Sequence, residues 1–334
     1  MNWKNGFSSS YYAYIIDPKS WRETERFELT GGSITRSDEG LRDSADIDCT
    51  EYENGKERYV RIYLDARQGG SDSHEPLFTG LATSPARDID GFYETNSIAC
   101  YSVLKAAEDV LLERGYYVPA GTNGADAIKD LLSCIPAPIE VEGNAPDLQT
   151  SIIAEEVETR LSMADRVLSA IGWRMRISGA GTVMISEKPV DVGIQFDPVD
   201  QDVLEPSISV NYDWYACPNV LRAVQDDLSA VARDDSPDSM LSTINRGREV
   251  WAEETSCELN MGESISEYAV RRLKELQRVQ LTASYDRRYH PDVLVGDIIR
   301  LRYPAQGLDG LFRVTAQTIE LSHGAKTSEE VEAV

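Results

Sequence analysis

The chain has 334 residues, more than one ordinary compact core holds, so two or three domains are expected. Apolar residues make up 41% and charged residues 27%, as in folded globular proteins, and no stretch approaches the ~18–20 continuous apolar residues of a membrane span. The net charge of −24, from 57 acidic against 33 basic residues, argues against the phosphate-neutralising surface of an ordinary DNA- or RNA-binding protein.

The N-terminal part of the sequence predicts a β domain over residues 1–102. Residues 1–6 are followed by serine and tyrosine rather than by an apolar core and a cleavage site, so no secretory signal is visible and synthesis in a cytoplasm is expected. From 26 to 101, short alternating stretches are broken by Gly, Pro, Asn and Asp, which is typical of strands and turns. Closure of this sheet into a barrel would hide its edges.

Three strands stand out within this domain, at 58–65, 77–82 and 93–101. In the first, alternation divides the side chains between two faces. One face carries Val60, Ile62 and Leu64, and the other carries Tyr59, Arg61 and Tyr63. Both faces are therefore expected to make contacts.

A small α+β domain is predicted over residues 103–190, where the apolar period changes to that of a helix. The first helix is expected from 103 to 111, with Ser102 as N-cap and Gly115 as its stop. The second spans 125–134, and the third about 163–171, with Ser162 and Asp165 resembling a capping box. Gly172 would end the third helix, and a hairpin follows from strands 173–177 and 182–186.

Residues 191–334 predict a second β-barrel domain with a helical insertion at about 236–279. The acidic, proline-containing segment 189–206 is interpreted as the crossing into it, and the Asp- and Ser-rich segment 226–245 as a mobile loop. A capping box of Ser264 and Glu267 opens a helix that ends near 278. The strands expected in this domain are 207–212, 219–224, 279–283, 298–303, 311–316 and 318–322. The predicted fold class is thus mainly β with α+β: two β-barrel domains flanking a small α+β module.

The residues that carry most enzyme chemistry show no catalytic spacing. The five cysteines, Cys49, Cys100, Cys134, Cys217 and Cys257, lie far apart and are interpreted as reduced and mostly buried packing residues. The three histidines, His74, His290 and His323, form no metal-binding motif, and glycine-rich phosphate loops and a G-x-S-x-G elbow are absent from the sequence. No catalytic, cofactor-binding or metal-ligating residue is predicted, and no cofactor is implied.

Two charged features and one aromatic cluster leave alternatives open. The carboxylate pairs Asp226-Asp227, Asp234-Asp235 and Glu155-Glu156 are typical of solvated surfaces, although a glycan-cleaving pair has the same composition. The helix residues Arg271, Arg272, Lys274 and Arg278 form a basic strip that either solubilises the helix or pairs with another subunit. The cluster of Tyr212, Trp214 and Tyr215 is compatible with carbohydrate binding.

The order and spacing of several segments resemble the tail hub, or late control, proteins of bacteriophages and related contractile injection systems. The C-terminal segments that carry the resemblance are 234–236, the helix with Ala269, Leu273 and Leu276, and the strands 279–283, 294–301, 310–314 and 319–321. Residues 76–80 are similar to the first tube-like barrel of that family, and 173–185 to its small middle hairpin. The resemblance covers most of the chain in arrangement.

The resemblance implies a homotrimer in which two tail-tube-like barrels per subunit form a pseudo-sixfold ring. Such a ring would join a hexameric tail tube, or a distal tail protein, to a threefold central spike or tail fibre at the tail tip or baseplate of a virion. DNA would pass through an acidic lumen without specific binding, because repulsion prevents adhesion. Tyr59, Arg61 and Tyr63 would then face either the lumen or a neighbouring subunit.

Three hypotheses follow from the sequence. The first is a non-enzymatic trimeric tail hub. The second is a carbohydrate-binding or glycan-cleaving β protein that uses paired carboxylates beside an aromatic cleft. The third is a different virion or tail-tube protein of the same barrel lineage, which would assemble as a hexamer.

Overall fold

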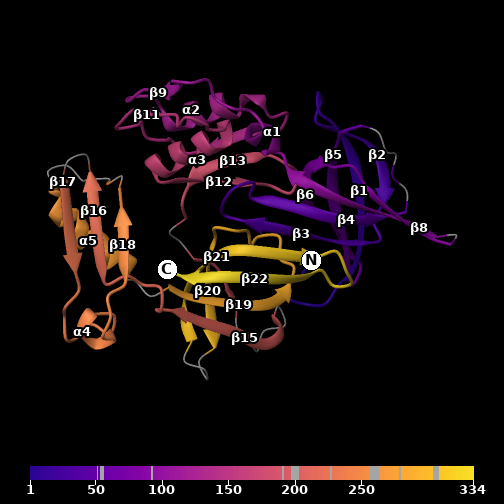
Figure 1. Cartoon of the computed structure of the whole chain (residues 1–334). Helices are drawn as coiled ribbons and strands as arrows, with labels where there is room; N and C mark the ends of the chain where they lie inside the picture. Colours follow the sequence, from indigo (N-terminus) through magenta and orange to yellow (C-terminus); the bar gives the residue numbers. More distant parts are fainter. Residues whose placement is uncertain are drawn as a thin grey trace. The chain divides into compact units, whose positions relative to one another are not determined.

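The computed structural model describes residues 1–50, 52, 56–91, 93–189, 192–196, 203–225, 228–255, 257, 263–277, 280–303 and 308–334. The chain is mainly β, as predicted (Figure 1). It divides into two compact units. Unit 1 comprises Met1–Ile208, Ser284–Glu332 and Val334, and unit 2 comprises Ser209–Ala283 and Ala333.

The first β region of unit 1 contains the three predicted strands and others that the sequence pattern missed. Its strands are β1 (Ser8–Asp17), β2 (Arg22–Glu28), β3 (Gly31–Ser37), β4 (Asp43–Cys49), β5 (Arg58–Gln68), β6 (Ser71–Ala82), β7 (Ala86–Asp90) and β8 (Tyr93–Ser102). Strand β5 pairs antiparallel with β1 and with β6. The pattern hides β1 because three consecutive residues, Tyr11, Tyr12 and Ala13, are buried, which breaks the alternation expected of a half-exposed strand.

The α+β module follows within unit 1. Its elements are α1 (Lys105–Glu108), β9 (Tyr117–Val118), α2 (Gly124–Leu131), η1 (Leu132–Cys134), β10 (Ile139–Glu142), β11 (Ile152–Ile153), α3 (Arg160–Ile171), β12 (Trp173–Ile177) and β13 (Val183–Glu187). Strands β10, β13 and β12 form a three-stranded sheet in that order, and helices α2 and α3 pack together. The predicted hairpin of β12 and β13 is confirmed, with Trp173 opposite Glu187.

Two helix predictions in this module are wrong in part. Helix α1 has four residues rather than nine, its N-cap is Leu104, and the chain beyond Asp109 turns into a ribbon paired with the segment before α3. Helix α3 begins at Arg160, and its N-cap is Thr159, whose hydroxyl accepts from the Ser162 amide at 3.1 Å. The predicted stop of α3 is confirmed, since Gly172 has the left-handed φ of 69° that favours glycine.

The second β region of unit 1 continues the sheet of the first. Its strands are β14 (Val192–Phe196), β15 (Val203–Asp213), β19 (Gln280–Arg288), β20 (Ile298–Tyr303), β21 (Leu308–Glu320) and β22 (Lys326–Ala333). Residues 209–213 of β15, residues 280–283 of β19 and Ala333 of β22 belong to unit 2. Strand β21 spans the strand predicted at 311–316 and the first three residues of that predicted at 318–322, and it pairs with β3, with Ile319 opposite Ile34. The main path of the sheet runs β15-β19-β22-β21-β3-β4-β8-β6-β5-β1-β2, and the pairings of the described residues do not close it into a ring. Closure into two barrels therefore stays a prediction.

Unit 2 is a small sheet with one helix on one face. Its elements are β16 (Val220–Gln225), β17 (Leu228–Arg233), α4 (Thr243–Arg246), β18 (Trp251–Glu254) and α5 (Ile265–Leu276). Strand β16 is central, antiparallel to β17 and parallel to β18. The face of the sheet that carries Leu221 and Ala223 packs against Tyr268, Ala269 and Leu273 of α5. The predicted capping box of α5 is confirmed: the Ser264 hydroxyl accepts from the Glu267 amide, and the Glu267 carboxylate accepts from the Ser264 amide.

The predicted mobile loop at 226–245 is wrong where the structure describes it, because β17 and α4 form within it. The buried Asn219 amide donates to the Leu241 carbonyl at 3.1 Å, and the Asn245 amide donates to the Pro237 carbonyl at 2.7 Å. Short polar side chains thus donate hydrogen bonds to backbone carbonyl groups of the turn, and the polar composition of this segment does not imply disorder. Asp226 and Asp227 lie outside the described residues.

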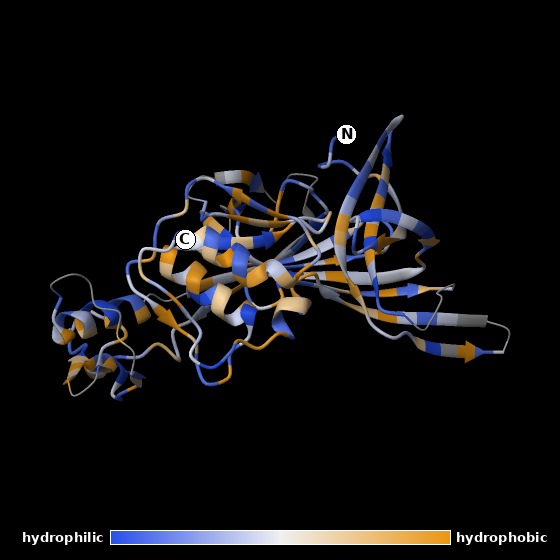
Figure 2. Cartoon of the chain, turned by 90° about the horizontal axis from the view of Figure 1, so that it is seen from above, coloured by the Kyte–Doolittle hydropathy of each residue, from blue (hydrophilic) through white to orange (hydrophobic). Residues whose placement is uncertain are grey.

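Alternation of apolar and polar residues builds the cores of unit 1. Figure 2 shows hydrophobic and hydrophilic bands succeeding one another along the strands. Val60, Ile62 and Leu64 of β5 are fully buried in the first β region, as predicted. The α+β module has a core of its own, centred on α2, α3 and β12. None of the helices in the described part of the chain has the length and apolar character to cross a membrane.

Candidate functional site

The residues that would carry metal or nucleophilic chemistry are dispersed. Among the described residues, no three His, Cys, Asp or Glu side chains gather where they would hold a metal ion. His74 pairs with Asp65 on the exposed surface of the first β region, Nδ1 to Oδ1 2.5 Å. All five cysteines are free; four are buried as predicted, and Cys134 is exposed. Burial raises the pKa of the Cys49 thiol to about 11, which opposes formation of the nucleophilic thiolate.

The carboxylate pairs hold local structure in place. The Asp234 carboxylate accepts from the Ser239 hydroxyl at 2.6 Å and from the Gln277 amide at 3.0 Å. The neighbouring Asp235 accepts from the Thr243 hydroxyl. These bonds fix the turn before α4, which agrees with the interpretation of the pairs as ordinary surface groups.

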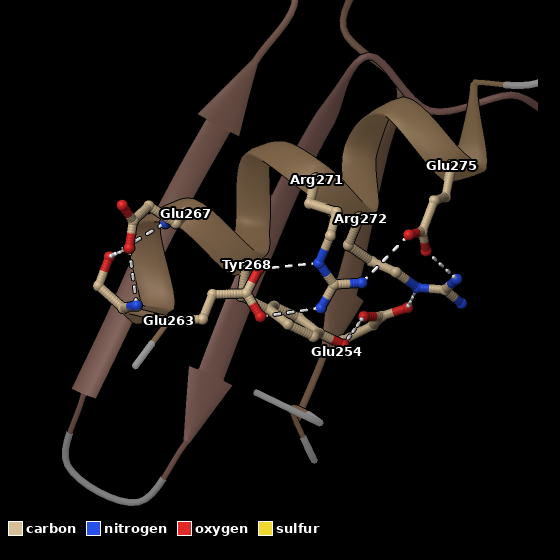
Figure 3. Close-up of polar contacts among 8 residues, drawn as sticks. Glu254, Glu263, Glu267, Tyr268, Arg271, Arg272 and Glu275 are labelled. Carbon is tan, nitrogen blue, oxygen red and sulfur yellow. Dashed lines mark hydrogen bonds and ion pairs between the residues drawn. The ribbon is translucent and has the colours of Figure 1, made fainter. Parts of the chain in front are cut away.

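The basic strip of α5 is engaged within its own unit (Figure 3). Arg271 pairs with Glu263 at 2.8 Å and with Glu275 at 3.1 Å, and Arg272 pairs with Glu254 of β18 at 2.8 Å. Hydrogen bonds from Arg272 hold the pKa of the Glu275 carboxyl below its usual value. These contacts fasten α5 to the strand beneath it. Arg278, the last predicted member of the strip, lies outside the described residues.

The outer face of β5 is also occupied by intramolecular contacts. The Tyr59 ring lies 5.6 Å from the Trp21 ring, and the Tyr63 ring stacks on Tyr12 at 5.4 Å. Arg61 between them is buried. The expectation that Arg61 faces a lumen or a neighbour is therefore wrong, because the guanidinium group is covered by the α+β module.

Arg61 joins the first β region to the turn between β12 and β13. Its Nε donates to the Thr79 hydroxyl at 3.0 Å, and its Nη2 donates to the Ala180 carbonyl at 2.8 Å. The Thr79 hydroxyl in turn donates to the Gly179 carbonyl at 2.8 Å. A Cβ at Gly179 would lie 1.7 Å from the Pro76 carbonyl oxygen, so this close approach of two backbones requires glycine.

Two more arginines connect the α+β module to both β regions of unit 1. Arg42, between β3 and β4, donates to the Met175 carbonyl at 3.0 Å and pairs with Asp165 of α3 at 2.5 Å. Arg174 of β12 pairs with Asp297, which precedes β20, at 3.3 Å. Asp165, expected to form a capping box, thus serves as an ion-pair partner across 123 residues of sequence. Strand β12 therefore contacts both β regions of unit 1, through Arg42 on one side and Asp297 on the other.

A buried carboxyl lies at the same junction. Burial raises the pKa of Asp43 to about 7, against a hydrogen bond from Ser102 and the charges of Arg36 and Arg42, which lower it. A small cavity of about 20 Å³ adjoins this group and is lined by residues of the first β region, of β12 and of the segment before β20. The sequence offers no signal for this cluster, because its members come together only through non-local packing.

A second buried cluster lies inside the second β region. Arg287 and Glu329 pair at 2.6 Å with side-chain exposures of 1% and 0%. The Glu329 carboxylate also accepts from the Tyr285 hydroxyl at 2.6 Å and from the Gln317 amide at 2.5 Å. Burial opposes ionisation of Glu329, but Arg287 and these donors hold the pKa of its carboxyl below the usual value. A buried charge with this many partners is consistent with a fixed structural role.

The aromatic cluster of unit 2 contacts arginines. Trp214 and Tyr215 are exposed, and their ring centroids lie 6.4 Å apart. The guanidinium groups of Arg246 and Arg248 lie 5.9 Å from the Trp214 ring and 4.6 Å from the Tyr215 ring. The charged groups that lie over these two rings are thus cations, whereas the glycan hypothesis predicts two carboxylates.

The fold of this chain is similar to that of several proteins of known structure. No protein-family model matches the sequence, and no curated protein matches it. The 43 kDa tail protein of prophage MuSo2 from Shewanella oneidensis is 13% identical, with a TM-score of 0.67 over 97% of each chain. A tail protein from Neisseria meningitidis MC58 is also 13% identical, with a TM-score of 0.69 over 98% of this chain and 97% of that one. The chain has the fold of phage tail proteins.

The same fold extends to a secretion-system protein. The Escherichia coli c3393 protein, a component of the type VI secretion system described as similar to the phage T4 tail proteins gp27 and gp5, has a TM-score of 0.53 at 8% identity. The match covers 96% of this chain and 76% of that one. The resemblance predicted from the sequence is confirmed for the fold. In this tail-protein fold, Arg42, Arg61 and Arg174 are among the residues that hold the middle module to the β regions.

Proposed function

We propose that the chain is a structural tail or baseplate hub of a bacteriophage or phage-like particle and acts by assembly rather than by catalysis. The observation that carries this proposal is the correspondence over 97–98% of this chain and 97% of each of two phage tail proteins. The buried links between the middle module and both β regions support a rigid building block.

The proposed assembly is a homotrimeric ring with pseudo-sixfold symmetry. Residues 1–102 and 191–334 would each supply one β-barrel domain, with residues 103–190 between them, so that three subunits present six similar domains. Such a ring fits a hexameric tail tube on one side and a threefold spike or fibre on the other. The continuous sheet of the two β regions favours a fixed angle between the two domains of each subunit.

The charge of the chain supports the proposed channel. A net charge of −24 repels a polyanion, so DNA would slide through the ring during ejection without adhering to it. The partners proposed are a tail tube or distal tail protein and a central spike or tail fibre protein, in the tail of a phage or of a contractile injection system. No specific nucleic-acid binding is expected.

The mass of the assembled protein tests this proposal. Light scattering on the purified chain, alone and with its tail neighbours, is expected to give about three times the subunit mass of 37.2 kDa. A chain that stays monomeric at high concentration and with its neighbours would overturn the trimer. A hexamer would instead indicate a tail-tube protein.

An activity assay tests the non-enzymatic part of the proposal. Incubation of the chain with peptidoglycan is expected to release no reducing sugar. Release that is abolished by a single Asp or Glu substitution would support the glycan-cleaving alternative and contradict a purely structural role.

A further inference from the structure

An apolar patch is exposed on the α+β module, away from the contacts that hold this module to the β regions. It consists of Leu111, Tyr117, Ile153 and Val157, and we name it the ribbon patch. Their exposed fractions are 61%, 58%, 63% and 76%, and Val157 is the most exposed of the four. Contiguous apolar side chains of this exposure typically mark an interaction surface.

Backbone pairing brings these residues together on one ribbon. Tyr117 of β9 is opposite Ile153 of β11, and Leu111 forms a bridge with Thr159. Between the two pairs, the Ala154 amide donates to the Tyr116 carbonyl at 2.9 Å, and the Leu112 amide donates to the Glu158 carbonyl at 2.9 Å. Segments 110–118 and 152–160 therefore run side by side, and the directly opposed side chains of Tyr117 and Ile153 project from the same face of the ribbon.

Alternation along the ribbon separates a buried face from an exposed one. Val118 and Ile152, the sequence neighbours of Tyr117 and Ile153, are buried in the core of the module. The exposed face is thus a second apolar face of a ribbon whose first face already packs against the module.

The turn that carries Val157 is fixed rather than loosely attached. The buried Glu158 carboxylate accepts from the Glu155 amide at 2.8 Å and pairs with Arg166 of α3 at 2.8 Å. Arg166 also donates to the Ile153 carbonyl at 3.0 Å. The patch is therefore presented on a preformed surface, which lowers the entropy lost on binding.

The rim of the patch is acidic. Glu113, Glu155 and Glu156 are exposed on the two segments, and the one exposed arginine between 110 and 118, Arg114, pairs with Glu156 at 3.2 Å. A second copy of this acidic chain would bring like charges against this rim, whereas a basic partner would complement it.

We propose that the ribbon patch binds a segment of another protein whose apolar centre is flanked by lysine or arginine. The apolar centre would cover Ile153 and Val157, and the flanking cations would meet the acidic rim. This inference goes beyond the proposed ring, since it concerns a partner held by the middle module and not the contacts between copies.

A peptide titration with the full-length chain tests the inference. The probes are a labelled 14-residue amphipathic helix of leucine and lysine and a matched peptide of leucine and glutamate, followed by fluorescence anisotropy. We expect the lysine peptide to bind at least tenfold more tightly than the glutamate peptide. The double variant Ile153→Ser, Val157→Ser is expected to weaken binding of the lysine peptide at least tenfold, because the apolar contact is lost while the net charge is unchanged.

The control is Ile89→Ser, which removes a similarly exposed isoleucine from β7 without a change of charge. It is expected to bind the lysine peptide as wild type does. Equal binding by the wild-type chain and the ribbon-patch variant would show attraction by net charge alone and would overturn the inference.

Light scattering separates this inference from the proposed trimer. The ribbon-patch variant is expected to keep the oligomeric mass of the wild-type chain. A lower mass for the variant would mean that the ribbon patch forms contacts between copies of this chain. That result would overturn the inference, although a ring of copies would remain possible. A wild-type monomer that still binds the lysine peptide through the patch would overturn the trimer alone.

Discussion

The charged residues inside unit 1 and those around helix α5 of unit 2 form similar ion pairs in different surroundings. Arg287 and Glu329 of unit 1 are almost fully buried, whereas Arg272 and Glu254 of unit 2 are partly exposed at a comparable distance. Removing one partner of a buried pair leaves a charge without compensation, while water replaces a partner at the surface. The number of ion pairs in a region therefore says less about its stability than their burial does.

The largest effect is expected from the buried pair of the second β region. Glu329→Gln keeps the shape of the side chain but removes the negative charge that pairs with the buried Arg287 guanidinium group. We expect the free energy of unfolding to fall by about 3–5 kcal/mol. Urea denaturation measures the change.

The control for this variant is Asp309→Asn, which breaks a pair with Arg300 at the surface of unit 1. The control is expected to leave the urea midpoint near that of the wild-type chain. If Glu329→Gln also keeps a urea midpoint near that of the wild-type chain, burial does not determine how much an ion pair contributes to the free energy of unfolding. The contrast between buried and exposed pairs would then be wrong.

An intermediate effect, and one that depends on pH, is expected at the junction of unit 1. The folded-state pKa of Asp43 is about 7, above the ordinary value of ~3.9 for an unfolded chain, so folding favours the neutral carboxyl. Its contribution to stability is fully present below about pH 4 and is lost as the pH rises through 7. Asp43→Asn is expected to remove this dependence and to be more stable than wild type above pH 7 by roughly 2–4 kcal/mol, on the order of 1.4 kcal/mol per pKa unit.

Urea denaturation of both proteins at intervals from pH 4 to 8 checks this expectation. The groups that face Asp43 are Ser102 on β8 and the guanidinium groups of Arg36 and Arg42. A difference between the two proteins that is constant with pH would mean that Asp43 is ionised in the folded state over the whole interval, as it is in the unfolded chain, and would contradict the raised pKa.

Local patterns explain which parts of this architecture were predictable. The alternation of β5, the left-handed Gly172 and the capping box of Ser264 and Glu267 each depend on neighbours in sequence, and each was predicted correctly. The helix expected at 103–111 failed because Val110 and Leu111 match a helical period, although their actual partners lie near residue 160. Leu111 consequently belongs to the exposed ribbon patch rather than to the core.

The residues that hold the middle module could not be found in this way. Arg42 and Asp165 are separated by 123 residues, and an arginine that becomes buried has no local signature in sequence. The sequence did predict the resemblance to tail proteins, because that resemblance depends on the succession of strand and helix patterns along the chain. The exposed surfaces and the contacts between the module and the β regions depend on which elements pack together in three dimensions, and only the structure shows that packing.

The smallest effect is expected on helix α5, where Arg271 and Arg272 form four ion pairs. Arg272→Met removes the pairs with Glu254 and Glu275 but keeps much of the apolar stem that covers β18. We expect a loss of only about 0.2–1 kcal/mol in the free energy of unfolding, and less at 0.5 M NaCl, since exposed charges are screened. Lys274→Met, an equal change of charge on an exposed residue of the same helix, serves as the control in urea denaturation. If Arg272→Met instead lowers the free energy of unfolding by several kcal/mol, and salt does not change this loss, the ion pairs of α5 behave like buried ones. The difference between the two units would then not be explained by the exposure of their ion pairs to water.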